Sequence, residues 1–227
     1  MKILMPLLFL VLAAASWSAD AAVVALDTGH SPSQPGSRSA YGRPEHGFNV
    51  QLAHYVAYHL KARGIAVVRI EGEYALKDRT IGTDKVDLFV SLHHDSIQQS
   101  WIDAGKREQY SGFSVFVSGK NPKFRQSLWC AQNVGGKLAG IGEKPSMYHA
   151  TPIKGENRPL VDGPSGVHLY HDLVVLKTSK APALLVEAGV IANPHEDRRL
   201  GDPRVSNHLA IAIADGISQC LAHMPAY

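Results

Sequence analysis

Short apolar runs alternate with helix-like segments along the chain, and this alternation is the feature that most constrains its fold. The apolar runs are residues 23–26, 65–70, 87–92, 113–117 and 183–186. Helical periodicity is found in residues 49–64, 123–142 and 206–221. Continuous apolar strands that alternate with helices are typical of a sheet buried on both faces. We therefore predict an α/β fold, a single domain with a mostly parallel or mixed central sheet covered by helices on both faces.

Composition supports one globular domain. The 227 residues are 45% hydrophobic and 19% charged, which suits a full apolar core and argues against disorder. The net charge of +3 comes from scattered Lys and Arg, a pattern that does not indicate nucleic-acid binding. We find no internal repeat or linker, and the main irregular insertion is the Gly-, Pro- and His-rich stretch around 142–172.

The N-terminus has the pattern of a secretory signal peptide. Lys2 precedes an apolar run at 3–15, and Ala19 and Ala21 form an A-x-A cleavage site. We expect residues 1–21 to be removed, which leaves a catalytic domain at 22–227 that is exported, most simply to a bacterial periplasm, or secreted. The alternative, an uncleaved membrane anchor, is disfavoured because the apolar run is short. No cysteine follows the run, so we predict no lipid or membrane anchor after cleavage.

Two cysteines remain in the exported chain, Cys130 and Cys220. An oxidising compartment would allow them to pair, whereas two isolated thiols could equally be small buried apolar residues. They lack C-x-x-C spacing, which argues against a zinc or redox motif.

Ionisable residues follow three of the predicted strands. They are the segments 27–30 (DTGH), 93–95 (HHD) and 187–189 (EAG). A single histidine at such a point is more often a hydrogen-bonded rim residue than a ligand. In open α/β sheets, however, ligands bind beyond the carboxyl ends of the strands, so three such ends together predict a site there.

The residue types favour a hydrolytic metal centre at that edge. Two histidines and a carboxylate with an open fourth position suit zinc, which lowers the pKa of a bound water to near 7. A second carboxylate, held off the metal, is then needed to move protons. Spacing alone leaves open which acid is the ligand and which is the base.

Three segments carry a more specific pattern. "GHSPSQPGSRSAYGRPE" places Glu45 fifteen positions after His30, "SLHHD" contains His93, and "PALLVEAGVIANPHE" contains Glu187. In this order and context they resemble the zinc-dependent N-acetylmuramoyl-L-alanine amidases of the amidase type 3 family. The resemblance extends from residue 23 to residue 221 and includes Asn49 and the pattern Leu-x-x-Arg at 76–79.

The sequence departs from that family pattern in a few places. Ser31-Pro32 replaces Gly-Gly, His94 replaces a small residue, and Val190 and Ala192 replace Phe and Ser. The expected ligands remain intact, so these departures bear on the shape of the cleft more than on its chemistry.

The resemblance implies a function and a role for each residue. His30, Glu45 and His93 would hold one Zn²⁺ per chain, and Glu187 would be the catalytic proton carrier. The substrate would be peptidoglycan, cut at the amide between N-acetylmuramic acid and the L-alanine of the stem peptide. Export would bring the enzyme into the compartment of that substrate.

Other polar residues have two interpretations each. His94 and Asp95 could support the metal site or contact substrate, or they could be a rim residue and a turn residue. His168 and His171, inside the insertion, could contact substrate or hold a second metal, or lie outside the site.

Rival functions remain. The nearest is another exported zinc peptidase or amidase on the same scaffold, and a less favoured one is a wall-binding module with a dead site, since all four expected site residues are present. A serine or cysteine hydrolase is disfavoured because the chain has no G-x-S-x-G elbow. We predict no protein activator, because the prolines of the insertion do not suit an inhibitory helix.

Overall fold

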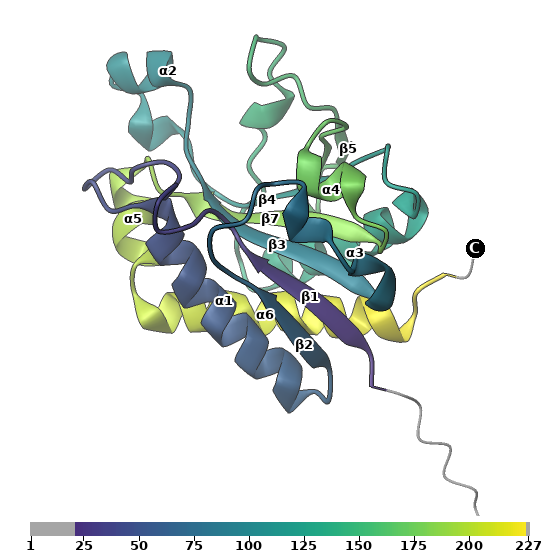
Figure 1. Ribbon diagram of the computed structural model, residues 1–227. Coiled ribbons are helices and arrows are strands. Elements are labelled where there is room, and N and C mark those ends of the chain that lie inside the picture. The colour runs from purple at the N-terminus through teal and green to yellow at the C-terminus, as the bar shows by residue number, and fades with distance from the viewer. Residues whose placement is uncertain (1–20, 226–227) are drawn as a thin grey trace, which may run out of the picture.

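A seven-stranded mixed sheet forms the centre of the protein, whose computed structural model describes residues 21–225 (Figure 1). The strands are β1 (Val23–Thr28), β2 (Ala66–Ile70), β3 (Leu88–Asp95), β4 (Ser114–Val117), β5 (Leu160–Asp162), β6 (Val167–Leu169) and β7 (Ala183–Val190). Their order across the sheet is β2-β1-β3-β7-β4-β6-β5. Strands β2, β1, β3 and β7 are parallel, and β4 runs antiparallel to β7. The predicted α/β class with a mixed sheet is confirmed.

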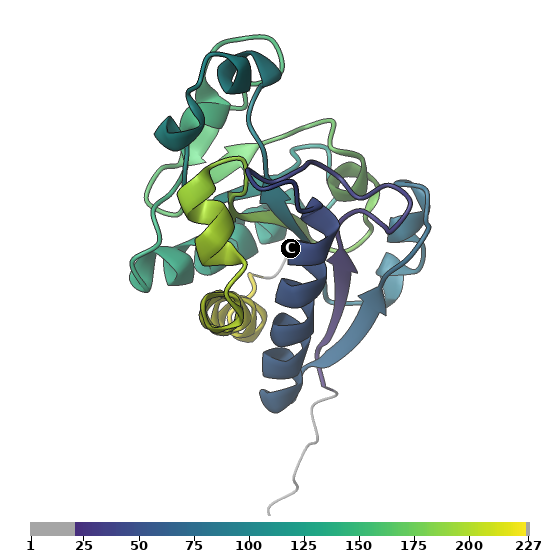
Figure 2. The ribbon, with the colours of Figure 1, turned by 90° about the vertical axis from the view of Figure 1, so that its left-hand side faces the viewer.

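Helices cover both faces of this sheet. The described α-helices are α1 (Glu45–Ala62), α2 (Gln99–Asp103), α3 (Phe124–Gly140), α4 (Val174–Thr178), α5 (Pro194–Leu200) and α6 (Pro203–Ala222). Helices α1 and α6 lie on one side of the sheet and the short α4 lies on the other (Figure 1). In the turned view, α6 is seen nearly end-on beside α1 (Figure 2).

The core is divided by the sheet. The larger apolar cluster includes Leu52 of α1, Val90 of β3 and Ile213 of α6. The smaller cluster joins Phe89 of β3 to Val175 of α4. Phe89 and Val90 are consecutive and face opposite sides, as the period-two alternation of a strand requires. Both faces are therefore buried, which is why the strands read as continuous apolar runs.

The central strands extend further than their apolar runs predicted. Expected to end at residues 92 and 186, β3 continues to Asp95 and β7 to Val190. His93 and Glu187 are therefore paired residues inside strands, not residues after them. Backbone hydrogen bonds do not depend on side-chain polarity, so a strand can continue where the apolar pattern stops.

Two further boundaries were predicted wrongly. Helix α1 begins at Glu45, four residues before the periodic stretch that starts at residue 49, and it ends at Ala62. The stretch around 142–172 is only partly irregular, because β5 and β6 lie within it and add two strands to the sheet. Both strands have three residues, which is too short for periodicity to reveal.

Cys130 of α3 and Cys220 of α6 form a disulfide, 90 residues apart in sequence. Both side chains are fully buried within the larger core cluster. The bond joins two helices on the same face of the sheet.

Within residues 21–225, no helix has both the length and the apolar character that crossing a membrane requires. The predicted signal peptide, apart from its last residue, lies outside the described residues.

Candidate metal centre and active site

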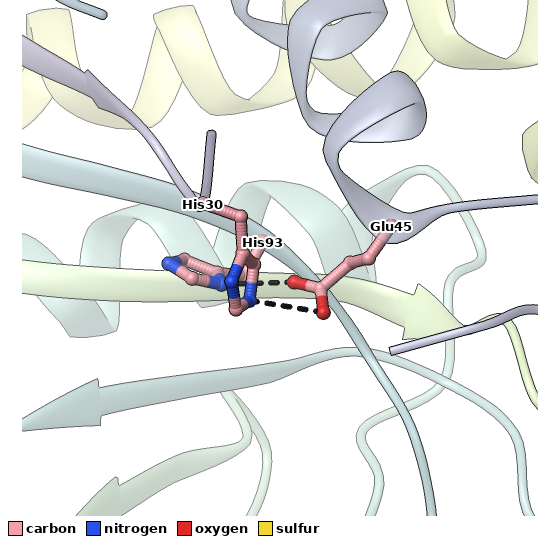
Figure 3. A group of neighbouring side chains, drawn as sticks. All are labelled: His30, Glu45 and His93. Carbon is pink, nitrogen blue, oxygen red and sulfur yellow. Dashed lines mark hydrogen bonds and ion pairs between the residues drawn. The ribbon is translucent and has the colours of Figure 1, made fainter. Parts of the chain in front are cut away.

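His30, Glu45 and His93 converge near the carboxyl ends of strands β1 and β3 (Figure 3). His30 follows β1, Glu45 is the first residue of α1, and His93 lies in β3. Their candidate ligand atoms all lie within 4.8 Å of one another. The carboxylate of Glu45 contacts both imidazoles, with Oε2 3.0 Å from Nε2 of His30 and Oε1 2.9 Å from Nδ1 of His93. Two imidazole nitrogens and a carboxylate are a donor set that suits Zn²⁺.

Two glycines make room for this cluster. A Cβ on Gly29 would lie 2.3 Å from Nε2 of His93, and a Cβ on Gly36 would lie 2.5 Å from Oε2 of Glu45. Gly36 also has a positive φ of 76°, which side chains disfavour. The backbone therefore packs directly against the donor groups, with no space for a larger residue.

The loop that carries His30 is held in an unusual conformation. His30 has a φ of 66°, in the left-handed region that is uncommon for residues other than glycine. The buried Arg79 fixes this loop: Nη2 donates to the carbonyl of His30 at 2.6 Å, and Nη1 donates to Asp27 Oδ1 at 2.6 Å. The Leu-x-x-Arg pattern thus has a structural role in placing the first histidine.

Hydrogen bonds keep the Glu45 carboxylate ionised. Burial would raise the pKa of Glu45, but the hydrogen bonds with His30 and His93 hold that pKa well below its usual range. The backbone N–H and hydroxyl of Ser37 also donate to Oε2, at 3.1 and 3.0 Å. Asn49 Nδ2 donates to Oε1 at 3.3 Å and to the carbonyl of Gly29 at 3.1 Å. An anionic carboxylate is the form that binds a metal ion.

His94 lies on the opposite face of β3 from His93 and packs towards α1. Its Nδ1 is 2.8 Å from Oδ1 of Asn49, and its ring contacts that of Phe48. Burial lowers the pKa of His94 to about 3, so the imidazole stays neutral. The structure therefore places His94 behind Glu45, which it reaches through Asn49.

Glu187 lies beside His93, at the paired position of the adjacent strand β7. No residue of the described chain hydrogen-bonds to its buried Oε2 atom. Burial, together with the negative charges of Asp95 and Glu45, raises the pKa of Glu187 well above its usual range. A carboxyl group with a raised pKa and an unused oxygen is suited to accepting and releasing a proton.

Asp95 belongs to a buried network that the sequence did not reveal. His149, from the 142–172 stretch, bridges two carboxylates: its Nε2 is 2.7 Å from Asp95 and its Nδ1 is 2.9 Å from Glu156. Tyr148 donates its hydroxyl to Asp95, and Gln98 donates to Glu156 at 2.6 Å. Burial would lower the pKa of His149, but the charges and hydrogen bonds of both carboxylates raise it to about 9. The side chain is therefore an imidazolium at neutral pH.

The other two candidate histidines lie outside the cluster of His30, Glu45 and His93. His168 is buried in β6, where its ring nitrogens contact the carbonyls of Ser146 and Arg158. His171 is exposed, and its ring lies against Gly119. Neither belongs to the described group that could hold a metal ion.

Sequence reasoning missed several residues around this site. Ser37 and His149 carried no signal, because neither follows a strand or forms part of a ligand pattern. Their roles depend on contacts between segments far apart in sequence, such as the 54 positions that separate Asp95 from His149.

Comparison with known proteins places most of the described chain in one family. A family model described as "N-acetylmuramoyl-L-alanine amidase" matches residues 24–219. The chain is 27% identical to N-acetylmuramoyl-L-alanine amidase AmiA of Escherichia coli K12, over 86% of this chain and 74% of that protein. It is 24% identical to the probable cell wall amidase LytH of Staphylococcus aureus, again over 86% of this chain. It spans 56% of LytH, or about half of its length.

Solved structures share the fold. The alignment with the amidase Ami1 of Mycobacterium smegmatis has a TM-score of 0.72 at 22% identity. It covers 88% of this chain and 97% of the Ami1 chain. The alignment with an N-acetylmuramoyl-L-alanine amidase of Clostridium difficile 630 has a TM-score of 0.70 at 21% identity. It covers 90% of this chain and 98% of the other chain. At these identities, the similarity to the solved structures shows a shared fold.

Proposed function

Because the chain belongs to the amidase type 3 family of N-acetylmuramoyl-L-alanine amidases, we propose that it is an exported, zinc-dependent peptidoglycan hydrolase. It would cleave the amide bond between N-acetylmuramic acid and the L-alanine that begins the stem peptide. The observation that carries this proposal is the convergence of His30, Glu45 and His93 beside Glu187, whose buried Oε2 atom has no hydrogen-bond partner among the described residues.

His30, Glu45 and His93 would hold the zinc ion. The close approach of Gly29 and Gly36 and the ionised state of Glu45 both support this donor set. When bound, zinc would polarise the scissile carbonyl and make water a stronger nucleophile at neutral pH. Asn49 and Ser37 would keep the Glu45 carboxylate turned towards the two imidazoles.

Glu187 would carry the proton during hydrolysis. It would accept the proton of the attacking water and pass it to the nitrogen of the departing alanine. The raised pKa of Glu187 supports this role, because a group that exchanges a proton works best when its pKa is near the ambient pH. Its fixed position beside His93 would keep the carboxyl next to the metal ligands.

Export and independence from an activator are further parts of the proposal. The disulfide between Cys130 and Cys220 suits an oxidising compartment such as the periplasm. The side chain of His30 is 32% exposed and that of His93 is 17% exposed, so solvent reaches the ligand cluster. This exposure supports an enzyme that is open to substrate without a partner protein.

The test is hydrolysis of purified peptidoglycan by mature protein, with the released stem peptides identified by mass. We expect new L-alanine N-termini in the presence of zinc and none with a chelator. Glu187→Gln should lower kcat by roughly 10²–10⁴-fold while the protein still binds one zinc. Glu108→Gln, which changes an exposed glutamate away from the site, is the matched control and should retain activity.

Other results would point elsewhere. Cleavage of free peptides but not of muropeptides would identify a zinc peptidase on the same scaffold. Full activity of Glu187→Gln would show that Glu187 is not the proton carrier. Hydrolysis that begins only when another protein is added would contradict an open enzyme.

A further inference from the structure

His94 is a histidine of β3 that the protein buries almost completely, with 2% of its surface exposed. Its Nδ1 atom is 2.8 Å from Oδ1 of Asn49, and its ring centroid is 5.5 Å from that of Phe48. The chain departs from the family pattern at this position, where a small residue is expected. A polar ring is costly to bury without a hydrogen bond, so the contact with Asn49 is what allows an imidazole here.

The surroundings of Asn49 fix which way its amide group faces. Asn49 is fully buried, and its Nδ2 atom is 3.1 Å from the carbonyl oxygen of Gly29 and 3.3 Å from Oε1 of Glu45. A carbonyl oxygen and a carboxylate oxygen can only accept hydrogen bonds, so the amide nitrogen must face them. The amide oxygen therefore faces His94. Because that oxygen also can only accept, Nδ1 of His94 must carry a hydrogen and donate it.

The amide of Asn49 joins two segments that carry proposed metal ligands. Gly29 precedes His30 in the loop after β1, and Glu45 begins α1. The one amide nitrogen donates to both segments, so its position fixes Oε1 of Glu45 relative to that loop. The same Oε1 atom is 2.9 Å from Nδ1 of His93. A turn of the Asn49 amide would therefore release the carboxylate oxygen that contacts His93.

The hydrogen bond from His94 opposes such a turn. Without this donor, Oδ1 of Asn49 would be buried with no partner, which is costly. A side chain of similar volume that lacks a donor would also keep water out. The amide could then find a partner for Oδ1 only by turning away, and Nδ2 would lose its contacts with Gly29 and Glu45.

We infer that His94 is a positioning residue for the proposed metal centre, because its Nδ1–H group holds the amide nitrogen of Asn49 towards Glu45 and the carbonyl of Gly29. The inference rests on the proposed function for the metal that the centre binds. The order of donors and acceptors from His94 to Glu45 is a property of the chain itself.

The first test compares two substitutions of His94 by zinc titration against a competing chelator. His94→Leu removes the donor and should lower zinc affinity by roughly 10–100-fold, as the loss of groups that orient metal ligands does. His94→Asn should retain most of the affinity of the parent, because its amide nitrogen, like Nδ1 of histidine, is bonded to Cγ and can donate to Asn49. Equal losses in the two variants would overturn the inference, since rescue by a donor is what a purely structural role would not show.

Phe48→Leu is the matched control for packing. It removes the ring contact with His94 but leaves the hydrogen bond to Asn49 in place. Urea unfolding should show a less stable protein, whereas zinc affinity should equal that of the parent. A loss of zinc affinity as large as that of His94→Leu would identify packing, and not the hydrogen bond, as the cause.

A double-mutant cycle tests whether His94 acts through Asn49. Asn49→Leu alone should lower zinc affinity, and adding His94→Leu should then lower it no further, because the amide that His94 holds is already absent. Additive losses would show that His94 reaches the metal centre by another route and would overturn the inference.

The last measurement needs neither zinc nor catalysis. Nitrogen-15 NMR of the imidazoles in the metal-free parent should find the hydrogen of His94 on Nδ1, and a hydrogen on Nε2 alone would overturn the inference. Failure of the parent to bind zinc would overturn the proposed metal centre, and with it this role of His94, even with the hydrogen on Nδ1. Zinc binding and hydrolysis by the parent, with unchanged zinc affinity in His94→Leu, would overturn only the role of His94.

Discussion

At the scale of single residues, the site depends on how closely backbone approaches the donor groups. Gly36 and Gly42 lie in the same loop and both have positive φ, 76° and 80°. They differ in surroundings, because a Cβ at Gly36 would meet Glu45 and His30, whereas a Cβ at Gly42 would meet nothing within 4 Å. Alanine substitutions at these two glycines therefore separate the effect of backbone strain from the effect of displacing Glu45 and His30.

We expect Gly36→Ala to lower zinc affinity by roughly 10–100-fold, a loss similar to that caused by removing groups that orient metal ligands. Gly42→Ala should cost about 1 kcal/mol in stability through the same backbone strain but leave zinc affinity unchanged. Zinc titration and urea unfolding of the two variants measure both effects. Equal losses of zinc affinity in the two variants would show that strain alone, and not contact with Glu45, is responsible.

The sequence predicted the residues that meet at the candidate metal centre better than the contacts that support them. His30, Glu45 and His93 were named from a linear pattern, and the structure brings their donor atoms together. His149 was not named, because its partner Asp95 is 54 positions away and no local pattern links them. A sequence pattern reflects the local structure of one segment. The contact between His149 and Asp95 forms only when segments far apart in sequence pack together.

At the scale of elements, His149 joins the 142–172 stretch to the end of β3. Its pKa of about 9 in the folded protein exceeds the ordinary value near 6.5. The charged form therefore stabilises the fold fully below about pH 6.5, and this contribution is lost as the pH rises through about 9. We expect the Tm difference between the parent and His149→Gln to be largest near pH 6, where both carboxylates and the imidazole are charged, and to shrink as the pH rises through about 9.

Thermal unfolding at a series of pH values measures this difference. His171→Gln, which changes an exposed histidine, should show no such dependence. A constant Tm difference for His149→Gln from pH 6 to pH 10 would mean that the bridge does not depend on the charge of His149.

The disulfide is the second connection between elements, since it ties α3 to α6. Replacing both cysteines with alanine should lower the free energy of unfolding by about 2–5 kcal/mol, because the unfolded chain regains the freedom that the crosslink removes. Urea unfolding of the oxidised parent and of the double variant gives this value. The single variant Cys130→Ala should lose nearly as much as the double variant. A single variant that lost only half would indicate packing at each position as the main cause.

The elements also show where sequence patterns end. The long helices and the central strands were predicted because their apolar faces repeat over many residues. The ends of β3 and β7 were not, since His93, Asp95 and Glu187 interrupt the apolar run while the backbone pairing continues. The short strands β5 and β6 pair with sheet neighbours through contacts that only the folded chain provides.

At the scale of the whole molecule, zinc should stabilise the folded protein because the proposed ligands come from three separate segments of the chain. A ligand that binds only the folded state at 100 times its dissociation constant adds about 2.7 kcal/mol. For a domain of this size that corresponds to a rise in Tm of roughly 5–10 °C. Differential scanning calorimetry of the metal-free protein with and without zinc tests this expectation. His93→Ala should remove the response, and an unchanged rise in that variant would place the stabilising zinc elsewhere.

The pairing of His93 with Glu187 has a consequence for how such an enzyme can diversify. Because the two residues occupy paired positions on adjacent parallel strands, their spacing follows the interstrand distance of about 4.8 Å and not the course of any loop. The loops around this pair can then change in length and composition while the distance between His93 and Glu187 stays constant. Substrate choice and bond-breaking chemistry are thus encoded in separable parts of the chain, and new specificities can arise by loop replacement alone.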